Sequence, residues 1–292
     1  MRPQASATRE ISYATSAQTR GGRALIRVLE NATGRLGLIR RARGYEDEVA
    51  QGRDFWEVMV ERYGLSLDLV GGSLDAIPRE GPVVVIANHP YGILDGLILG
   101  YILSKARGEF RILAHQVFRK AAELEKIILP ISFDETKEAV KLNIATRQEC
   151  LRVLGAGGCI GVFPGGTVST SQKLFGAPMD PGWRGFTAKM IARSNATVVP
   201  IYFDGANSRL FQIASHVHNT LRVALLIQEF RKRVDEPVKV AIGAPFAHEA
   251  IDRYRGNPRE LMDFLRSETY RLSPKPLKSL DYGFEFEEKH RL

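Results

Sequence analysis

Short apolar runs alternate with longer amphipathic segments through most of the chain. The runs cover residues 67–70, 83–87, 110–114, 129–133, 160–163, 198–203 and 238–242. Continuous apolar runs of this length are typical of strands buried on both faces, and their alternation with helical segments is typical of α/β proteins. We therefore expect an α/β fold with a largely parallel central sheet covered by helices.

The N-terminal quarter has a helical pattern instead. Between Gly22 and Arg43, apolar residues recur at spacings of four and three, at Leu25, Leu29, Ala32, Leu36 and Ile39. A second amphipathic segment, starting at Phe55, ends before Gly64. These patterns predict an N-terminal amphipathic helical pair over residues 22–66, with apolar stripes that either pack on the sheet or enter a membrane surface.

The two ends of the chain are expected to be tails. Residues 1–21 are rich in Ser, Ala, Thr and Arg and lack the apolar core of a secretory signal, which predicts a disordered tail. We expect one α/β domain over residues 67–275 and a C-terminal tail over residues 276–292. Since no stretch reaches about 18 uninterrupted apolar residues, any membrane contact is expected to be peripheral.

Charge and cysteine content narrow the partners. The net charge of +8 and pI near 9.5 favour an acidic partner such as anionic lipid, nucleic acid or an acidic protein. No nucleic-acid motif or cluster of basic residues interleaved with aromatics is present, so nucleic acid is disfavoured. Cys150 and Cys159 have no metal-binding spacing, which predicts reduced thiols and no metal site.

The strongest candidate for chemistry lies where the strand over residues 83–87 ends. Asn88, His89 and Pro90 follow this strand directly, and Asp95 falls in the first turn of the next predicted helix. A neutral imidazole removes a proton from a hydroxyl when a carboxylate orients its other nitrogen. The alternative is that His89 caps the helix and Asp95 only compensates the helix dipole.

A second segment of the same kind follows the strand over residues 160–163. It reads Phe163-Pro-Gly-Gly-Thr-Val-Ser169, a glycine-rich turn whose backbone N–H groups are suited to an anion or a polarised carbonyl. It matches neither the phosphate loop nor the dinucleotide fingerprint, so nucleotide binding is disfavoured. A serine hydrolase is disfavoured as well, because no Gly-x-Ser-x-Gly elbow is present.

Together the two segments resemble the glycerolipid acyltransferase family, whose members carry an Asn-His-x4-Asp block and then a Phe-Pro-Glu-Gly-Thr-Arg-Ser block. The resemblance runs from about Val83 to Phe246. It implies that His89 is the general base, that Asp95 orients it, and that residues 67–275 form the acyltransferase domain. The implied substrate-binding residues are Asn88, Tyr91, Phe163, Pro164, Gly165, Gly166, Thr167 and Ser169.

Three departures from the family pattern refine this hypothesis. Five residues, not four, separate His89 from Asp95, a form similar to a bacterial branch that acylates ornithine-type aminolipids. Gly165 replaces the family's Glu, and Val168 replaces its Arg. Because the fork of that arginine matches phosphate oxygens, its loss argues against a phosphate-bearing acceptor.

The resemblance therefore implies O-acylation of a lyso-aminolipid of the lyso-ornithine type. The expected donor is an acyl carrier protein (ACP) or coenzyme A (CoA) thioester, with no bound cofactor. The enzyme is expected at the cytoplasmic face of the inner membrane, and the implied lipid substrate favours membrane association of the helical region over residues 22–66. Five basic residues are candidate contacts for an acidic carrier: Lys105, Arg107, Lys137, Lys141 and Arg147. The alternatives are a lysophosphatidic acid acyltransferase and a non-catalytic basic lipid-binding protein.

Overall fold

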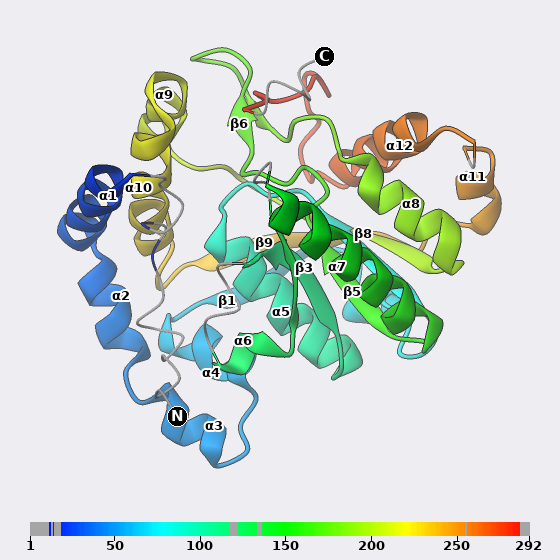
Figure 1. Cartoon of the computed structure of the whole chain (residues 1–292), viewed down its shortest axis with the longest axis horizontal. Helices are drawn as coiled ribbons and strands as arrows, with labels where there is room; N and C mark the ends of the chain where they lie inside the picture. Colours follow the sequence, from blue (N-terminus) through cyan, green and yellow to red (C-terminus); the bar gives the residue numbers. More distant parts are fainter. Residues whose placement is uncertain are drawn as a thin grey trace.

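A seven-stranded sheet in the order β1-β9-β8-β2-β5-β3-β4 runs through the centre of the fold (Figure 1). The computed structural model describes residues 12, 14, 19–116, 122–132, 136–254 and 256–286. The strands are β1 (Ser66–Gly71), β2 (Val83–Ala87), β3 (Arg111–His115), β4 (Ile128–Ile131), β5 (Cys159–Val162), β8 (Thr197–Phe203) and β9 (Pro237–Ile242). A separate hairpin pairs β6 (Thr170–Ser171) with β7 (Pro178–Met179).

All neighbouring strands of the large sheet run parallel except β8 and β9. The prediction of a largely parallel α/β sheet is therefore confirmed, and each predicted apolar run overlaps one of the seven strands. The run over residues 129–133 extends past β4, and its last residue lies outside the described part. The antiparallel pair arises because the chain leaves β8 and enters β9 at the same edge of the sheet.

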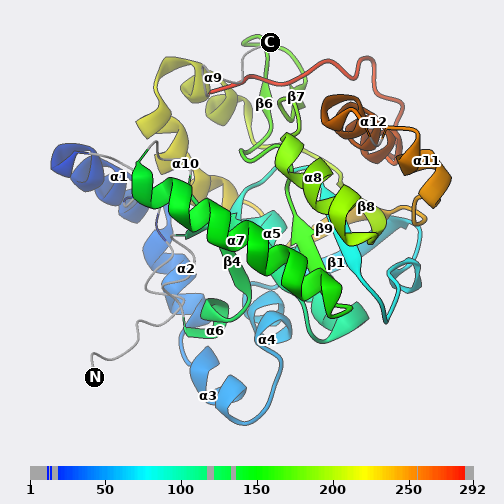
Figure 2. The same cartoon turned by 45° about the vertical axis from the view of Figure 1, so that its right-hand side comes forward.

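Helices cover both faces of this sheet (Figure 2). From residue 55 onward, the described helices are α4 (Phe55–Arg62), α5 (Ile93–Arg107), α6 (Ala122–Glu125), α7 (Lys137–Gly155), α8 (Gly185–Ser194), α9 (Arg209–Val217), α10 (Asn219–Arg231), α11 (His248–Asp252) and α12 (Pro258–Arg271), with a 3-10 turn η2 (Leu74–Ala76). Strand β2 has no exposed residue: Val83, Val85 and Ala87 join the core with α4 and α5, whereas Val84 and Ile86 join the core with α7, α8 and α12. This burial on both faces explains the unbroken apolar run of β2.

The expected N-terminal helical pair is instead four helices: α1 (Arg20–Thr33), α2 (Arg35–Ala42), α3 (Tyr45–Ala50) and α4. The prediction of one helix from Gly22 to Arg43 was wrong, because Gly34 has φ 130° and separates α1 from α2. The predicted apolar stripe does not face the core evenly either. Helix α1 buries Ile26 against α10, while Leu25 and Leu36 are exposed.

Two further features bear on the predicted ends and on membrane contact. In the described part of the C-terminal segment, Gly283 donates its N–H to the carbonyl of Asp180 and Phe284 donates to that of Thr170. This segment therefore lies along the β6–β7 hairpin. None of the helices in the described ranges is long and apolar enough to cross a membrane.

Packing of α5 on α4 gives a first test of the structure. A Cβ added at Gly100 would lie 2.2 Å from Cε3 of Trp56, whereas nothing lies within 4 Å of one added at Gly96 on the same helix. We expect Gly100→Ala to lower the free energy of unfolding by about 1–3 kcal/mol through overpacking. The control Gly96→Ala should raise it by up to about 1 kcal/mol through helix propensity. Urea denaturation measures both, and equal midpoints for the two variants would contradict this packing.

Candidate active site

The two sequence segments meet because their strands are neighbours. β2 pairs in parallel with β5, with Ile86 opposite Val162, so the loops that follow both strands leave the same edge of the sheet. β8 pairs with the other side of β2, with Ala87 opposite Ile201. Three strand ends thus converge at the edge where α/β proteins place their ligands.

His89 and Asp95 are in direct contact at this edge. Nδ1 of His89 lies 2.9 Å from Oδ2 of Asp95, and the Asp95 side chain is fully buried whereas that of His89 is 18% exposed. The His89 ring stacks on Phe163, with ring centroids 4.2 Å apart. The imidazole is therefore fixed by a carboxylate at Nδ1 and by an aromatic face, which leaves Nε2 as the nitrogen that can act on another molecule.

The start of α5 supports the carboxylate of Asp95. Its Oδ2 accepts backbone hydrogen bonds from Tyr91 (2.8 Å) and Gly92 (2.9 Å). Burial raises the pKa of Asp95 above its usual range, while the contact with His89 and these N–H groups act in the opposite direction. The position in the first helical turn also favours the charged form. The five-residue spacing between His89 and Asp95 thus agrees with a tight turn whose backbone N–H groups bind the Asp95 carboxylate.

Asn88 and Tyr91, both predicted to bind substrate, contact the protein itself. The Asn88 amide donates to the carbonyl of Phe203 (3.0 Å) and accepts from its N–H (2.7 Å). The Tyr91 hydroxyl donates to the carbonyl of Asp204 (2.7 Å), and burial raises the pKa of Tyr91 to about 12. Both side chains therefore tie the His89 loop to the end of β8.

The second segment forms a turn beside His89. Ser169 donates its N–H to the carbonyl of His89 (2.8 Å), so the two loops are hydrogen-bonded to each other. Gly166 has φ 69° and donates its N–H to the carbonyl of Phe163 (3.0 Å). The carbonyl of Pro164 accepts from the N–H of Arg184. The Gly166 amide is therefore occupied within the turn, which narrows the predicted set of anion-binding N–H groups to Gly165 and Thr167.

An arginine contacts this turn from a distant part of the chain. Nη2 of Arg222, on α10, lies 2.7 Å from Oγ1 of Thr167 and 3.2 Å from the carbonyl oxygen of Val168. The loss of arginine at position 168 thus does not remove a guanidinium from this region, so that loss no longer argues against a phosphate-bearing acceptor. In the sequence, Arg222 stands only next to the apolar positions Val223, Leu226 and Ile227. Nothing within the motif indicated it, because the contact joins residues 55 positions apart.

Asp180 is a second buried carboxylate that the sequence did not reveal. It accepts hydrogen bonds from the N–H of His89 (3.2 Å), the hydroxyl of Ser169 (2.5 Å) and Nε1 of Trp183 (2.9 Å). Its own N–H donates to the hydroxyl oxygen of Tyr270 (2.8 Å). Asp180 therefore joins both loops of the site to the β7–α8 connection. A single aspartate in an irregular segment carries no pattern that identifies such a role.

Apart from the site around His89, the described residues offer little that is suited to metal binding or nucleophilic catalysis. Within those ranges, no group of three or more His, Cys, Asp or Glu side chains is arranged to hold a metal. A cavity of about 290 Å³ lies at the opposite end of α5, lined by residues that include Ser73, Asp75 and Lys105, and is separate from His89. Burial raises the pKa of Cys150 and of Cys159 to about 12, so neither thiol is an activated nucleophile.

The Asp180 contacts lead to a stability prediction. Asp180→Asn keeps the shape but turns an acceptor oxygen into an NH₂ group that faces hydrogen-bond donors. We expect the free energy of unfolding to fall by about 1–3 kcal/mol, the cost of buried unsatisfied groups. Chemical denaturation measures this loss. The control is Asp281→Asn at an exposed position, which should leave the midpoint unchanged, and an Asp180 variant as stable as this control would contradict the proposed linkage.

A family model described as Acyltransferase matches residues 72–204, which include both loops. A lyso-glycine lipid O-acyltransferase from Phocaeicola vulgatus is 25% identical over 230 residues, covering 76% of this chain and 78% of that protein. One of the same name from Bacteroides thetaiotaomicron is 26% identical over 231 residues, covering 76% and 80%.

Among solved structures, the 1-acyl-sn-glycerophosphate (LPA) acyltransferase PlsC from Thermotoga maritima is similar with a TM-score of 0.43 and 15% identity, covering 87% of this chain and 98% of that one. The family match and the two curated relatives agree with the two sequence blocks. The chain therefore fits the glycerolipid acyltransferase family.

Proposed function

We propose that this acyltransferase moves a fatty acyl group from a thioester to the free hydroxyl of a lyso-aminolipid, with His89 as general base and Asp95 as its orienting partner. The observation that supports this proposal best is the 2.9 Å contact between His89 Nδ1 and the fully buried Asp95 carboxylate. A cap and a dipole-compensating residue would need no such contact. The pair also lies at the sheet edge formed by the matched family segment.

In the proposed reaction, Nε2 of His89 takes the proton of the acceptor hydroxyl as its oxygen attacks the thioester carbonyl carbon. The new C–O bond forms, the C–S bond breaks, and the departing thiolate takes the proton from the imidazolium. Asp95 stabilises the imidazolium in between. No covalent enzyme intermediate is needed, which agrees with the two buried, unactivated thiols.

The oxygen of the tetrahedral intermediate needs donors near the thioester carbonyl. The N–H groups of Gly165 and Thr167 are the candidates, since Gly166 donates to Phe163. Phe163, Pro164 and Ser169 then act mainly by holding this turn against His89. We assign Asn88 and Tyr91 the same positioning role at the end of β8.

The acceptor class rests on the curated relatives and on Arg222. Both relatives are named for lyso-glycine lipid, whereas the sequence favoured the lyso-ornithine type. An amino-acid headgroup acylated on its nitrogen keeps a free carboxylate, which a guanidinium binds as readily as a phosphate. The contact of Arg222 with Thr167 therefore supports an anionic headgroup, and it also supports lysophosphatidate as a second candidate.

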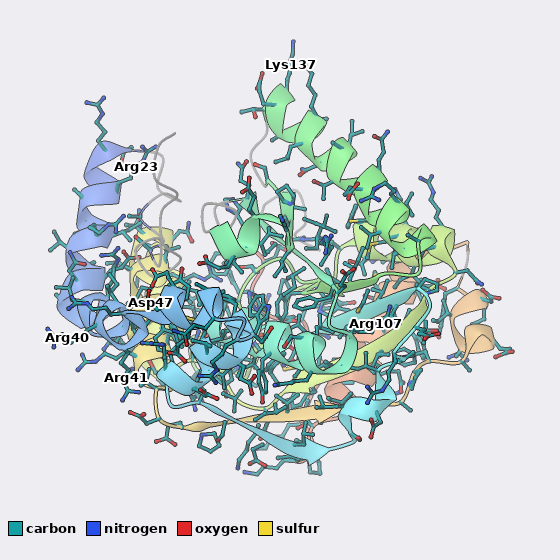
Figure 3. All side chains as sticks on the ribbon, turned by 90° about the horizontal axis from the view of Figure 1, so that it is seen from below. Arg23, Arg40, Arg41, Asp47, Arg107 and Lys137 are labelled. Carbon is teal, nitrogen blue, oxygen red and sulfur yellow. The ribbon has the colours of Figure 1, made fainter. Side chains whose placement is uncertain are left out.

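Donor and location are inferred from the substrate. We infer an ACP or CoA thioester as donor and a peripheral position on the cytoplasmic face of the inner membrane. Of the basic residues considered for a carrier protein, Lys105 pairs with Glu57, and Arg107 donates to the carbonyls of Pro78, Gly81 and Gly157. Figure 3 shows Lys137 at the projecting start of α7, which leaves α7 as the better candidate surface.

Substitution of the His-Asp pair tests the mechanism. His89→Gln keeps a polar side chain but removes the base, and we expect kcat to fall on the order of 10³-fold. Asp95→Asn should also lower kcat by a factor on the order of 10³. Because burial raises the pKa of Asp95, activity should fall with decreasing pH from a higher pH than the titration range of an exposed carboxyl. Steady-state kinetics across pH measure all three.

The matched control is Asp75→Asn on the exposed turn η2, which should leave kcat unchanged. Circular dichroism would verify that each variant is folded. A folded His89→Gln enzyme with more than half of the original kcat would refute the general-base role.

The acceptor is tested by offering lyso-glycine lipid, lyso-ornithine lipid and lysophosphatidate, each with acyl-ACP and acyl-CoA. We expect turnover of the amino-acid lipids. Arg222→Lys keeps the charge but loses the fork, and should raise the acceptor KM about tenfold with a smaller change in kcat. Arg231→Lys on the same helix is the control. Exclusive turnover of lysophosphatidate would overturn the aminolipid acceptor.

A further inference from the structure

Helix α9 has an apolar stripe on its outer side. Leu210, Ile213 and Val217 are spaced by three and four residues and are 54%, 38% and 67% exposed. The opposite side of the same helix buries Phe211 and Ala214. Helix α9 is thus apolar on both sides but buried on only one. Its outer apolar side is exposed to water, which solvates it poorly.

The turn of the β6–β7 hairpin, residues 172–177, continues this stripe. Leu174 is 45% exposed and Phe175 is 78% exposed, the largest exposure of any large apolar residue in the described ranges. Nη1 of Arg209, at the start of α9, donates to the carbonyl of Gly176 (2.9 Å), so the turn is fastened to the helix. We call Leu174, Phe175, Leu210, Ile213 and Val217 the apolar surface.

The apolar surface is built on the same segment as the candidate site. Strand β6 begins directly after Ser169, and the N–H of Ser171 donates to Oε1 of Gln212 on α9 (2.9 Å). Nε2 of His216 lies 2.9 Å from the carbonyl oxygen of Ser171. The apolar surface is therefore hydrogen-bonded to the chain segment that directly follows the turn beside His89.

The two segments that carry the apolar surface contain basic residues and no acidic ones. Residues 170–177 and 205–218 contain Lys173 and Arg209 but no Asp or Glu. Helix α1, which packs on α10 beside α9, adds Arg20, Arg23 and Arg27 with exposed Leu25 and Val28, and its one acid, Glu30, is fully buried. Figures 1 and 2 both show α1, α9 and the hairpin along one side of the molecule.

We propose that the apolar surface docks on an anionic lipid bilayer, with Phe175 inserted at the headgroup boundary and the basic residues of α1, Lys173 and Arg209 facing the headgroups. Exposed apolar side chains suit the headgroup boundary of such a bilayer, and the basic side chains around them suit its anionic headgroups. A symmetric contact with a second copy would instead bring the arginines of both copies together. The choice of a bilayer rests on the proposed lipid acceptor, because that substrate resides in one.

The test is sedimentation of the full chain with vesicles of one part phosphatidylglycerol and three parts phosphatidylcholine. The variant Leu174→Ser/Phe175→Ser should bind about tenfold more weakly or worse, and Ile213→Ser/Val217→Ser should bind more weakly too. The control Leu277→Ser, an exposed apolar residue outside the surface, should bind as the original protein does. Pure phosphatidylcholine vesicles should bind the original protein more weakly.

Unchanged binding by both double variants, with thermal unfolding confirming that they are folded, would overturn the proposal. A change from dimer to monomer in the variants, measured by light scattering without lipid, would also overturn it in favour of a second copy. Turnover of acceptor dispersed in detergent separates this inference from the proposed function. The double variants should retain this turnover in detergent. If the original protein shows no such turnover, the proposed function is refuted, but the vesicle-binding result still stands.

Discussion

Strand β2 pairs in parallel with β5 on one side and with β8 on the other. Because parallel neighbours end at the same edge, this pairing brings together loops that are distant in the chain, with Asn88 and Phe203 115 positions apart. The stacking of His89 on Phe163, the bond from Ser169 to His89 and the contact of Asn88 with Phe203 all depend on it. A shift of one residue between these strands would turn the buried side chains of β2 to the wrong face.

Two buried carboxylates give this edge its chemistry and its rigidity. Asp95 is fully buried, and its carboxylate is stabilised by the N–H groups of Tyr91 and Gly92 and by the imidazole that it orients. Asp180 is balanced by donors from three separate segments, and so fixes the backbone on which His89 and Ser169 sit. Burial strengthens both sets of contacts and makes the loss of a partner costly. The site therefore combines a proton-accepting pair with a structural carboxylate that holds the pair in place.

The segment that follows the second block connects the site to the molecular surface. The residues that pack on His89 continue within a few positions into a hairpin whose tip is exposed and apolar. Helix α9 is hydrogen-bonded to that hairpin through Gln212. Arg222 of α10 contacts Thr167 in the turn that precedes the hairpin. An acceptor that resides in a bilayer would thus reach the site along the same chain segment that meets the bilayer.

The sequence alone determined the seven strands of the large sheet, the α/β class and the place of His89 and Asp95 after a strand, but not the β6–β7 hairpin. These depend on apolar runs, on a proline after a strand and on short spacings, all of which are local. It did not determine that Gly34 separates α1 from α2, or that the expected stripe of α1 stays largely outside the core, because both depend on what α10 presents to α1. The contacts of Asp180 and Arg222 were also beyond it. Each links residues that are distant in the chain, and only the order of strands and helices in space decides which distant side chains share a buried environment.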